Sequence, residues 1–129
     1  MASSVIRVVI ADDVEALRAL VRIALEEHAD IAIVGEVSDG LSAVEAARDL
    51  TPDVMLLDVS MPGYDGLEAL IDIRAQSPTV SVVMLSGFAA SRLAPQAVEL
   101  GAHSYLEKGA SFEEIVGAVR SAASSKQPR

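Results

Sequence analysis

Residues 54–66 read VMLLDVSMPGYDG, and this stretch decides the fold. Its first four residues are apolar, which is typical of a short strand covered on both faces, and the acid Asp58 follows at once. Beyond the stretch, Leu67, Leu70 and Ile71 recur at helical spacing. A buried strand followed by a helix is the repeating unit of a parallel α/β sheet, in which ligands bind beyond the carboxyl ends of the strands. Asp58 therefore stands where a site is expected.

The same alternation extends over the whole chain. Short apolar runs rich in Val and Ile predict five strands, at residues 5–11, 31–37, 54–57, 80–85 and 103–106. Amphipathic stretches predict five helices, around residues 17–25, 41–47, 67–74, 95–100 and 112–119. This order predicts an α/β fold: a doubly wound five-stranded parallel sheet with helices on both faces. Residues 1–123 are expected to form this one domain, and residues 124–129 a polar tail or the start of a linker.

Local signals predict where some helices begin. Pro95 is interpreted as lying near the start of a short fourth helix, which Gly101 ends. Ser111, with Glu114 three residues later, predicts a capping box at the start of the fifth helix. The connection at residues 86–91 is made of mostly small residues, so it has few contacts to lose and can adopt two arrangements.

Composition excludes several classes of protein. The chain has 129 residues, 51% of them hydrophobic, which suits one domain with one core. It has no cysteine, which excludes a disulfide scaffold, a thiolate nucleophile and a cysteine zinc site. Its net charge of −9 repels phosphate backbones, so no nucleic acid binding is expected of this chain alone. No apolar run suits a signal peptide or a membrane span, so no membrane partner and a cytoplasmic location are expected.

Chemically active residues follow four of the five predicted strands. The second strand, which we expect at the edge of the sheet, ends without a comparable group. The residues that follow the others are Asp12 and Asp13, Asp58, Ser86, and Glu107 with Lys108. Because the carboxyl ends of parallel strands share one edge, five groups are predicted to meet there: the carboxylates of Asp12, Asp13 and Asp58, the hydroxyl of Ser86 and the ammonium of Lys108.

Each of these residues also has an ordinary structural interpretation. Asp12 is three residues before Glu15, which is the spacing of a helix-capping box. Asp58 alone could be an exposed turn residue, and Lys108 alone a solvated surface charge. Lys108 is, however, the only lysine apart from Lys126 near the end of the chain. The set as a whole indicates a site more strongly than any of its members.

The predicted set suits phosphoryl transfer. Three carboxylates close together repel one another, and at least one should have a raised pKa unless a cation compensates. Mg²⁺, or Mn²⁺, prefers carboxylate oxygens together with water and phosphate oxygens. Lys108 is a point charge suited to a phosphoryl oxygen, and a carboxylate can itself be the nucleophile that forms an acyl phosphate.

At this point the sequence resembles the response-regulator receiver family of two-component signalling, the CheY-like superfamily. The resemblance is carried by the acid pair 12–13, the stretch from Asp58 to Gly66, and then Ser86 and Lys108, and it covers about residues 5–122. It implies a flavodoxin-like strand order of 2-1-3-4-5. It further implies a phosphoprotein that acts in signal transduction and catalyses only its own phosphorylation and dephosphorylation.

The resemblance also implies roles for single residues. Asp58 would accept the phosphoryl group from a phosphohistidine of a sensor histidine kinase or a phosphotransfer protein. Asp13 would bind Mg²⁺ directly, Asp12 would help through water, and the main-chain carbonyl of Ser60 would be a further ligand beside Asp58. Lys108 would pair with the phosphoryl group.

A conformational switch belongs to the same resemblance. Ser86 would hydrogen-bond to the phosphoryl group and shift toward it, and Tyr105 would turn inward into the space that opens. The alternative for Tyr105 is a half-buried strand tyrosine, and both can hold. The output would be a changed surface on the fourth helix, fifth strand and fifth helix, through which a homodimer is possible.

The chain departs from the family pattern in three places. Gly109 stands where many members have proline, so a cis-proline constraint is absent, although glycine also permits an unusual loop. Residues 108–111, Lys-Gly-Ala-Ser, resemble receivers joined to helix-turn-helix DNA-binding domains, so the chain is expected to be either a stand-alone receiver or the receiver part of a transcriptional regulator. Ser60 and Phe88 occupy the positions at which, by the resemblance, the family tunes hydrolysis of the acyl phosphate, and neither side chain is suited to position water. Autodephosphorylation is therefore expected to be slow.

Three other classes of protein are alternatives to this interpretation. A phosphohydrolase of the haloacid-dehalogenase kind needs a second Asp two positions after the nucleophile, where this chain has Ser60. A flavodoxin needs a Ser/Thr-rich phosphate loop after the first strand, where this chain has Asp12 and Asp13. A pseudo-receiver, which only binds partners and is never phosphorylated, would have no need of the complete set of residues.

Overall fold

The computed structural model describes residues 5–125 and contains one five-stranded parallel sheet in the order β2-β1-β3-β4-β5. The strands are β1 (Ile6–Ala11), β2 (Ile31–Val37), β3 (Val54–Leu57), β4 (Ser81–Ser86) and β5 (Ser104–Glu107). The helices are α1 (Glu15–Glu26), α2 (Gly40–Leu50), α3 (Gly66–Gln76), α4 (Ala90–Glu99) and α5 (Phe112–Ser124). The predicted fold class, with its strand order, is confirmed.

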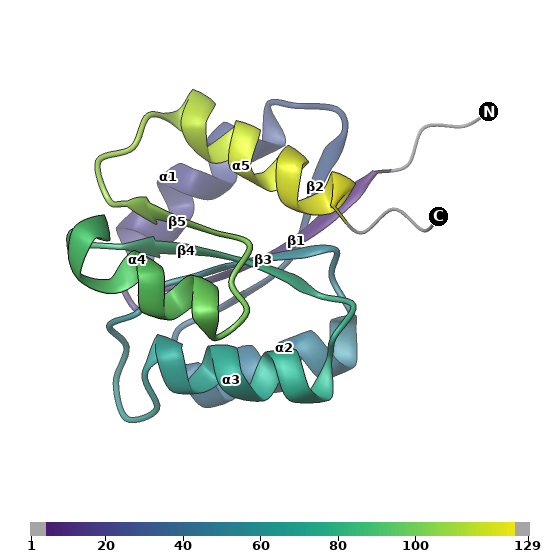
Figure 1. Cartoon of the computed structure of the whole chain (residues 1–129). Helices are drawn as coiled ribbons and strands as arrows, with labels where there is room; N and C mark the ends of the chain where they lie inside the picture. The colour runs from purple at the N-terminus through teal and green to yellow at the C-terminus, as the bar shows by residue number, and fades with distance from the viewer. Residues whose placement is uncertain (1–4, 126–129) are drawn as a thin grey trace.

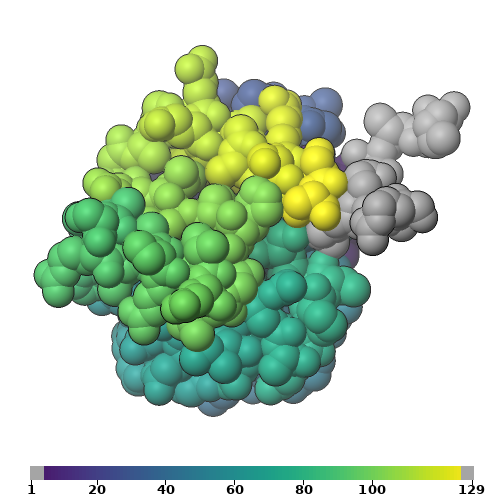
Figure 2. Space-filling model, viewed as in Figure 1, coloured from purple at the N-terminus to yellow at the C-terminus, as the bar shows by residue number. Residues whose placement is uncertain are grey.

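Helices cover both faces of the sheet. In Figure 1, α1 and α5 lie on one face, and α2, α3 and α4 lie on the other. Alternate residues of β1 serve the two sides: Val8 and Ile10 pack with α1 and α5, and Val9 packs with the helices opposite. The strands β3 and β4 are apolar on both faces for this reason. Figure 2 shows one continuous face formed by α4, α5 and the residues between them.

The fourth helix corrects the sequence interpretation. It begins at Ala90, five residues before Pro95, so the proline lies inside the helix and not near its start. Proline has no N–H to donate to the carbonyl four residues earlier, which normally disfavours such a position. Packing decides here: Ala97 is fully buried, and Leu93 packs against the same core. The N–H of Ala90 also donates to the Glu107 carboxylate at 2.8 Å, which supports the first turn.

The capping box predicted for α5 is present, and the alternative interpretation of Asp12 as a helix cap is not borne out. Ser111 and Glu114 form the predicted capping box at the start of α5. Asp12 is not the cap of α1, since that helix begins at Glu15 after Val14. The Asp12 carboxylate instead accepts the Val14 N–H at 2.8 Å, a tight turn that precedes the helix. The predicted strand bounds differ from the observed ones by one residue in β1, β4 and β5.

Candidate functional site

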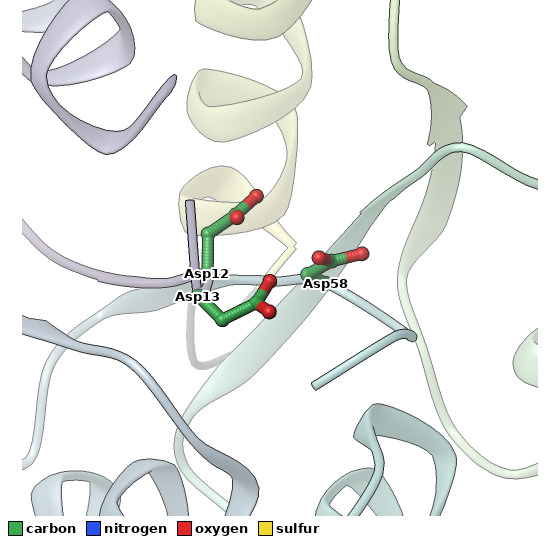
Figure 3. A group of neighbouring side chains, drawn as sticks. All are labelled: Asp12, Asp13 and Asp58. Atoms are coloured by element: carbon green, nitrogen blue, oxygen red, sulfur yellow. The ribbon is translucent and has the colours of Figure 1, made fainter. Parts of the chain in front are cut away.

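Three acids meet at the carboxyl edge of the sheet. β1 and β3 are neighbours, and Ala11 is in register with Leu57, so the residues that follow the two strands lie side by side. Carboxylate oxygens of Asp12, Asp13 and Asp58 all lie within 4.8 Å of one another (Figure 3). Asp12 and Asp58 are each 3% exposed, whereas Asp13 is open to solvent. The structure therefore brings the three predicted acids together.

Lys108 supplies the counter-charge of this cluster. Its Nζ lies 3.0 Å from an oxygen of Asp12 and 3.0 Å from an oxygen of Asp58. Lys108 follows β5, and its side chain reaches past β4. The main-chain N–H of Lys108 donates to the Ser86 carbonyl at 2.6 Å. Gly109 follows with a φ of 112°, a conformation that glycine adopts without strain, as the sequence predicted for this loop.

Burial and charge perturb two titratable groups of the cluster. Burial raises the pKa of Asp58, and the nearby Asp12 carboxylate adds to this rise, which exceeds the opposing effect of the hydrogen bond from Lys108. Burial works against the charged form of Lys108, but the hydrogen bonds to Asp58 and Asp12 outweigh it and raise the pKa of the ammonium. Lys108 is therefore held as a cation beside an acid whose charge is costly.

The loop between Asp58 and α3 is held closely against its surroundings. The Ser60 N–H donates to Asp58 Oδ1 at 3.2 Å, and the Gly66 N–H donates to the Val59 carbonyl at 2.7 Å. A Cβ on Gly66 would lie 2.0 Å from the Asp58 carbonyl oxygen, so only glycine fits there. The hydroxyl of Tyr64 donates to Asp72 of α3, which fastens the middle of the loop.

Ser86 ends β4 and is fully buried. Its Oγ accepts the Phe88 N–H at 3.1 Å, and the Tyr105 hydroxyl donates to the Phe88 carbonyl at 2.9 Å. Together with the contact of Glu107 to Ala90, three side chains thus hold the connection between β4 and α4. The structure places Tyr105 partly buried, in contact with the core on the α4 side.

The sequence interpretation missed two residues that support the acid pair. Arg18 was not among the predicted site residues, but its Nη1 donates to the Asp12 carbonyl at 2.6 Å. Glu36 of β2 accepts from Arg18 Nε at 3.3 Å, so the edge strand reaches the site indirectly. The spacing of Arg18 from Asp12, about one helical turn past the start of α1, was the available signal.

The cluster has the chemistry of a site for a hard divalent cation. All three acids offer carboxylate oxygens, the ligands that Mg²⁺ and Mn²⁺ prefer. One of the three is exposed, so a cation can approach from solvent, while the buried pair fixes the geometry. Asp12, Asp13 and Asp58 therefore fit a divalent cation.

One cavity of the described residues lies away from the acids. It has a volume of about 560 Å³ and lies between α1 and α5, lined by Leu20, Ile23 and Phe112 among others. None of the three clustered acids lines it. This cavity is therefore separate from the acid cluster.

The fold and this edge define a flavodoxin-like α/β protein with three clustered acids and a lysine at the carboxyl ends of its strands. The family model of the response regulator receiver domain matches residues 8–120. The chain belongs to this family, the receiver domains of two-component response regulators, whose role is signal transduction.

Relatives and solved structures agree with this assignment. The response regulator UvrY of Escherichia coli K12 is 40% identical over 122 residues, which are 95% of this chain and 56% of UvrY. The transcriptional regulatory protein LiaR of Bacillus subtilis is 39% identical over 124 residues, 96% of this chain and 58% of LiaR. The chain thus spans little more than half the length of these relatives.

Among solved structures, the signal receiver domain of NarL from Mycobacterium tuberculosis superposes with a TM-score of 0.89 at 35% identity, covering 94% of this chain and 98% of that one. A LuxR-family two-component response regulator from Aurantimonas sp. SI85-9A1 superposes with a TM-score of 0.90 at 29% identity, covering 95% and 87%. Within residues 5–125, no helix is both long and apolar enough to cross a membrane.

Proposed function

We propose that Asp58 accepts a phosphoryl group in a Mg²⁺-dependent reaction and that the chain thereby acts as a phosphorylation-dependent signal receiver. The observation that carries this proposal is the contact of one ammonium, Lys108, with two buried carboxylates, Asp12 and Asp58, beside the third acid Asp13. A site of this kind positions and neutralises charge, which is most of what phosphoryl transfer requires.

The transfer forms one bond and breaks one. An Oδ of the Asp58 carboxylate attacks phosphorus, the P–N bond of a phosphohistidine breaks, and the imidazole of the donor keeps the electron pair and takes up a proton. The product is an acyl phosphate on Asp58. With a small donor such as acetyl phosphate, the P–O bond breaks and acetate leaves.

The cation would be held by Asp12, Asp13 and Asp58 and by the main-chain carbonyl of Ser60, oxygen ligands that suit Mg²⁺ and Mn²⁺. When bound, the cation would supply positive charge that offsets the negative charge of the phosphoryl oxygens. Lys108 keeps its proton and, in the proposal, moves its hydrogen bonds from the carboxylates to a phosphoryl oxygen. Its raised pKa supports this role as a permanent cation.

The proposed switch runs through the connection between β4 and α4. Ser86 would turn its hydroxyl to the phosphoryl group, and the Phe88 N–H would then lose the acceptor that it has at 3.1 Å. Tyr105, whose hydroxyl bonds to the carbonyl of that same Phe88, would follow inward. The result is a changed surface on α4, β5 and α5, the face seen in Figure 2.

The partners follow from the family. The phosphoryl donor is proposed to be a sensor histidine kinase or a phosphotransfer protein, and a homodimer through α4, β5 and α5 is a further proposal. The LuxR-family names of structural relatives and the motif at residues 108–111 support a receiver that belongs to a transcriptional regulator. Residues 1–123 are proposed as the receiver unit. At a net charge of −9, this chain is not proposed to bind nucleic acid itself.

The test is incubation of the chain with Mg²⁺ and acetyl phosphate, followed by intact-mass analysis. The wild type is expected to gain one labile phosphoryl group, and Asp58→Asn none. Asp49→Asn is the matched control, because Asp49 is an exposed acid paired with Arg48 and lies outside the cluster. It should be phosphorylated like the wild type.

Three results would contradict the proposal. No adduct on the wild type in the presence of Mg²⁺ would favour the pseudo-receiver alternative. An adduct that persists on Asp58→Asn would place the acceptor elsewhere. Steady release of phosphate from phosphate monoesters would instead favour the phosphohydrolase alternative.

A further inference from the structure

We infer that Arg18 is a positioning residue of the cation site, which acts by holding the main-chain carbonyl of Asp12. This inference rests on the proposed function, because it concerns the affinity of the same acid cluster for Mg²⁺. It adds a residue outside the cluster to the machinery of the site. It also gives the edge strand β2 a part in that machinery.

Arg18 makes a close and shielded contact. Its Nη1 lies 2.6 Å from the Asp12 carbonyl oxygen, and its side chain is only 16% exposed. The Nε of the same guanidinium donates to Glu36 Oε1 at 3.3 Å, which fixes the plane of the group from the other side. The second oxygen of Glu36 pairs with Arg22 Nε at 2.8 Å. Glu36 is therefore an anchor, shared by two arginines of α1.

The Asp12 carbonyl matters because of what is bonded to it. It belongs to the peptide plane that joins Asp12 to Asp13, and the tilt of that plane sets the direction in which the Asp13 side chain leaves the backbone. Among residues 5–125, no hydrogen bond holds the Asp13 carboxylate itself, and it is exposed. Its aim toward the other two acids therefore depends on the backbone.

Asp12 is held at every other polar group as well. Its N–H donates to the Val37 carbonyl at 3.0 Å, its Oδ1 accepts the Val14 N–H, and its Oδ2 pairs with Lys108. Of these contacts, the one to Lys108 is proposed to be rearranged when a cation or a phosphoryl group arrives. The contact from Arg18 lies on the main chain and remains, so it can keep the acid pair in place throughout.

The geometry calls for arginine in particular. A planar guanidinium can donate to a carbonyl and a carboxylate at once, in fixed directions, whereas an ammonium is a point charge without such direction. Arg22 offers a matched control within the same helix, because it has the same charge and pairs with the other oxygen of the Glu36 carboxylate. Nothing in its contacts reaches Asp12.

The experiment is a calorimetric titration of the full chain with Mg²⁺, for the wild type, Arg18→Met, Arg18→Lys and Arg22→Met. Loss of a residue that orients a metal ligand typically weakens metal binding by about tenfold or more, and this is expected for Arg18→Met. Arg22→Met should change the dissociation constant by less than about twofold, since the Asp12 carbonyl is untouched. Arg18→Lys should resemble Arg18→Met, because charge without direction does not fix the peptide plane.

A metal-free readout separates positioning from general stability. The amide resonances of Asp13 and Val14 should shift in Arg18→Met and stay in place in Arg22→Met, while urea unfolding compares the stability of the two variants. A dissociation constant for Arg18→Met equal to that of the wild type would overturn the inference alone. Equal weakening in both variants would also overturn it and leave only a structural role. Absence of Mg²⁺ binding by the wild type would instead overturn the proposed function on which the inference rests.

Discussion

Asp58→Asn should make the metal-free protein more stable, although it removes the charge that Lys108 binds. The Asp58 carboxylate lies within 4.8 Å of that of Asp12, a repulsion of about 3.5 kcal/mol at an effective dielectric constant of about 20. Attraction to Lys108 at 3.0 Å is about 5.5 kcal/mol on the same scale, but Lys108 is 25% exposed, which weakens it. Burial of the carboxylate, 3% exposed, costs several kcal/mol more. The balance predicts a gain of about 1–2 kcal/mol in the free energy of unfolding.

The assay is urea unfolding of the wild type and Asp58→Asn near neutral pH, with a chelator present. The pKa of Asp58 is raised in the fold above its ordinary value of 3.8. In the pH window between the unfolded and the folded pKa of Asp58, the folded wild type therefore binds more protons than the unfolded chain. Its stability therefore falls as pH rises through the window, and the advantage of Asp58→Asn should shrink as pH is lowered into it. Excess Mg²⁺ should make the wild type the more stable of the two proteins, because a bound cation stabilises the folded state and Asp58→Asn lacks one of the acids that would hold it. The reasoning would be refuted if Asp58→Asn, measured without metal, were less stable than the wild type by an amount that does not change with pH.

Three further predictions concern other parts of the molecule. Gly66→Ala should lower the free energy of unfolding, measured in urea, by about 3 kcal/mol or more, because its Cβ would lie 2.0 Å from a main-chain oxygen. Gly117→Ala is the control: a Cβ at this position of α5 meets nothing within 4 Å, so the change should be neutral or stabilising. The hydrogen bond from Arg120 lowers the pKa of Asp30. Arg120→Gln should therefore cause a small loss of stability at neutral pH, and this loss should disappear as pH falls through the titration of Asp30. An equal loss at every pH would contradict this prediction. Ser60→Gln should shorten the lifetime of the acyl phosphate, measured by intact mass after removal of the donor, and an unchanged lifetime would count against a role of this position in hydrolysis.

Strand positions and strand-end acids were predictable from the sequence because both follow from local pattern. A strand buried on both faces must be apolar almost throughout, so β3 and β4 could be recognised as short continuous runs. Once the sheet is parallel, the residues that follow its strands must share an edge, whichever helices connect them. The convergence of Asp12, Asp58 and Lys108 was therefore predicted without any knowledge of side-chain contacts.

What the sequence could not predict depends on contacts between distant elements. Pro95 indicated a helix start, but α4 begins five residues earlier, at Ala90. It does so because Ala97 is buried in the core and because Glu107, at the end of β5, accepts the N–H of Ala90. The support of Asp12 by Arg18 depends in the same way on the position of Glu36, which is set by the pairing of β2 with β1. No pattern within a single segment contains this information.

The charges of the site explain why a lysine and a cation would both be needed. Three clustered carboxylates and one ammonium leave two negative charges uncompensated, which is the charge that a divalent cation supplies. On the proposed mechanism, the acyl phosphate replaces the single charge of Asp58 by about two. The added charge lies on the phosphoryl group, so it favours movement of the Lys108 ammonium away from Asp12. The main-chain N–H of Lys108 is hydrogen-bonded to the Ser86 carbonyl. Movement of Lys108 would therefore act on Ser86, the residue from which the connection to α4 begins.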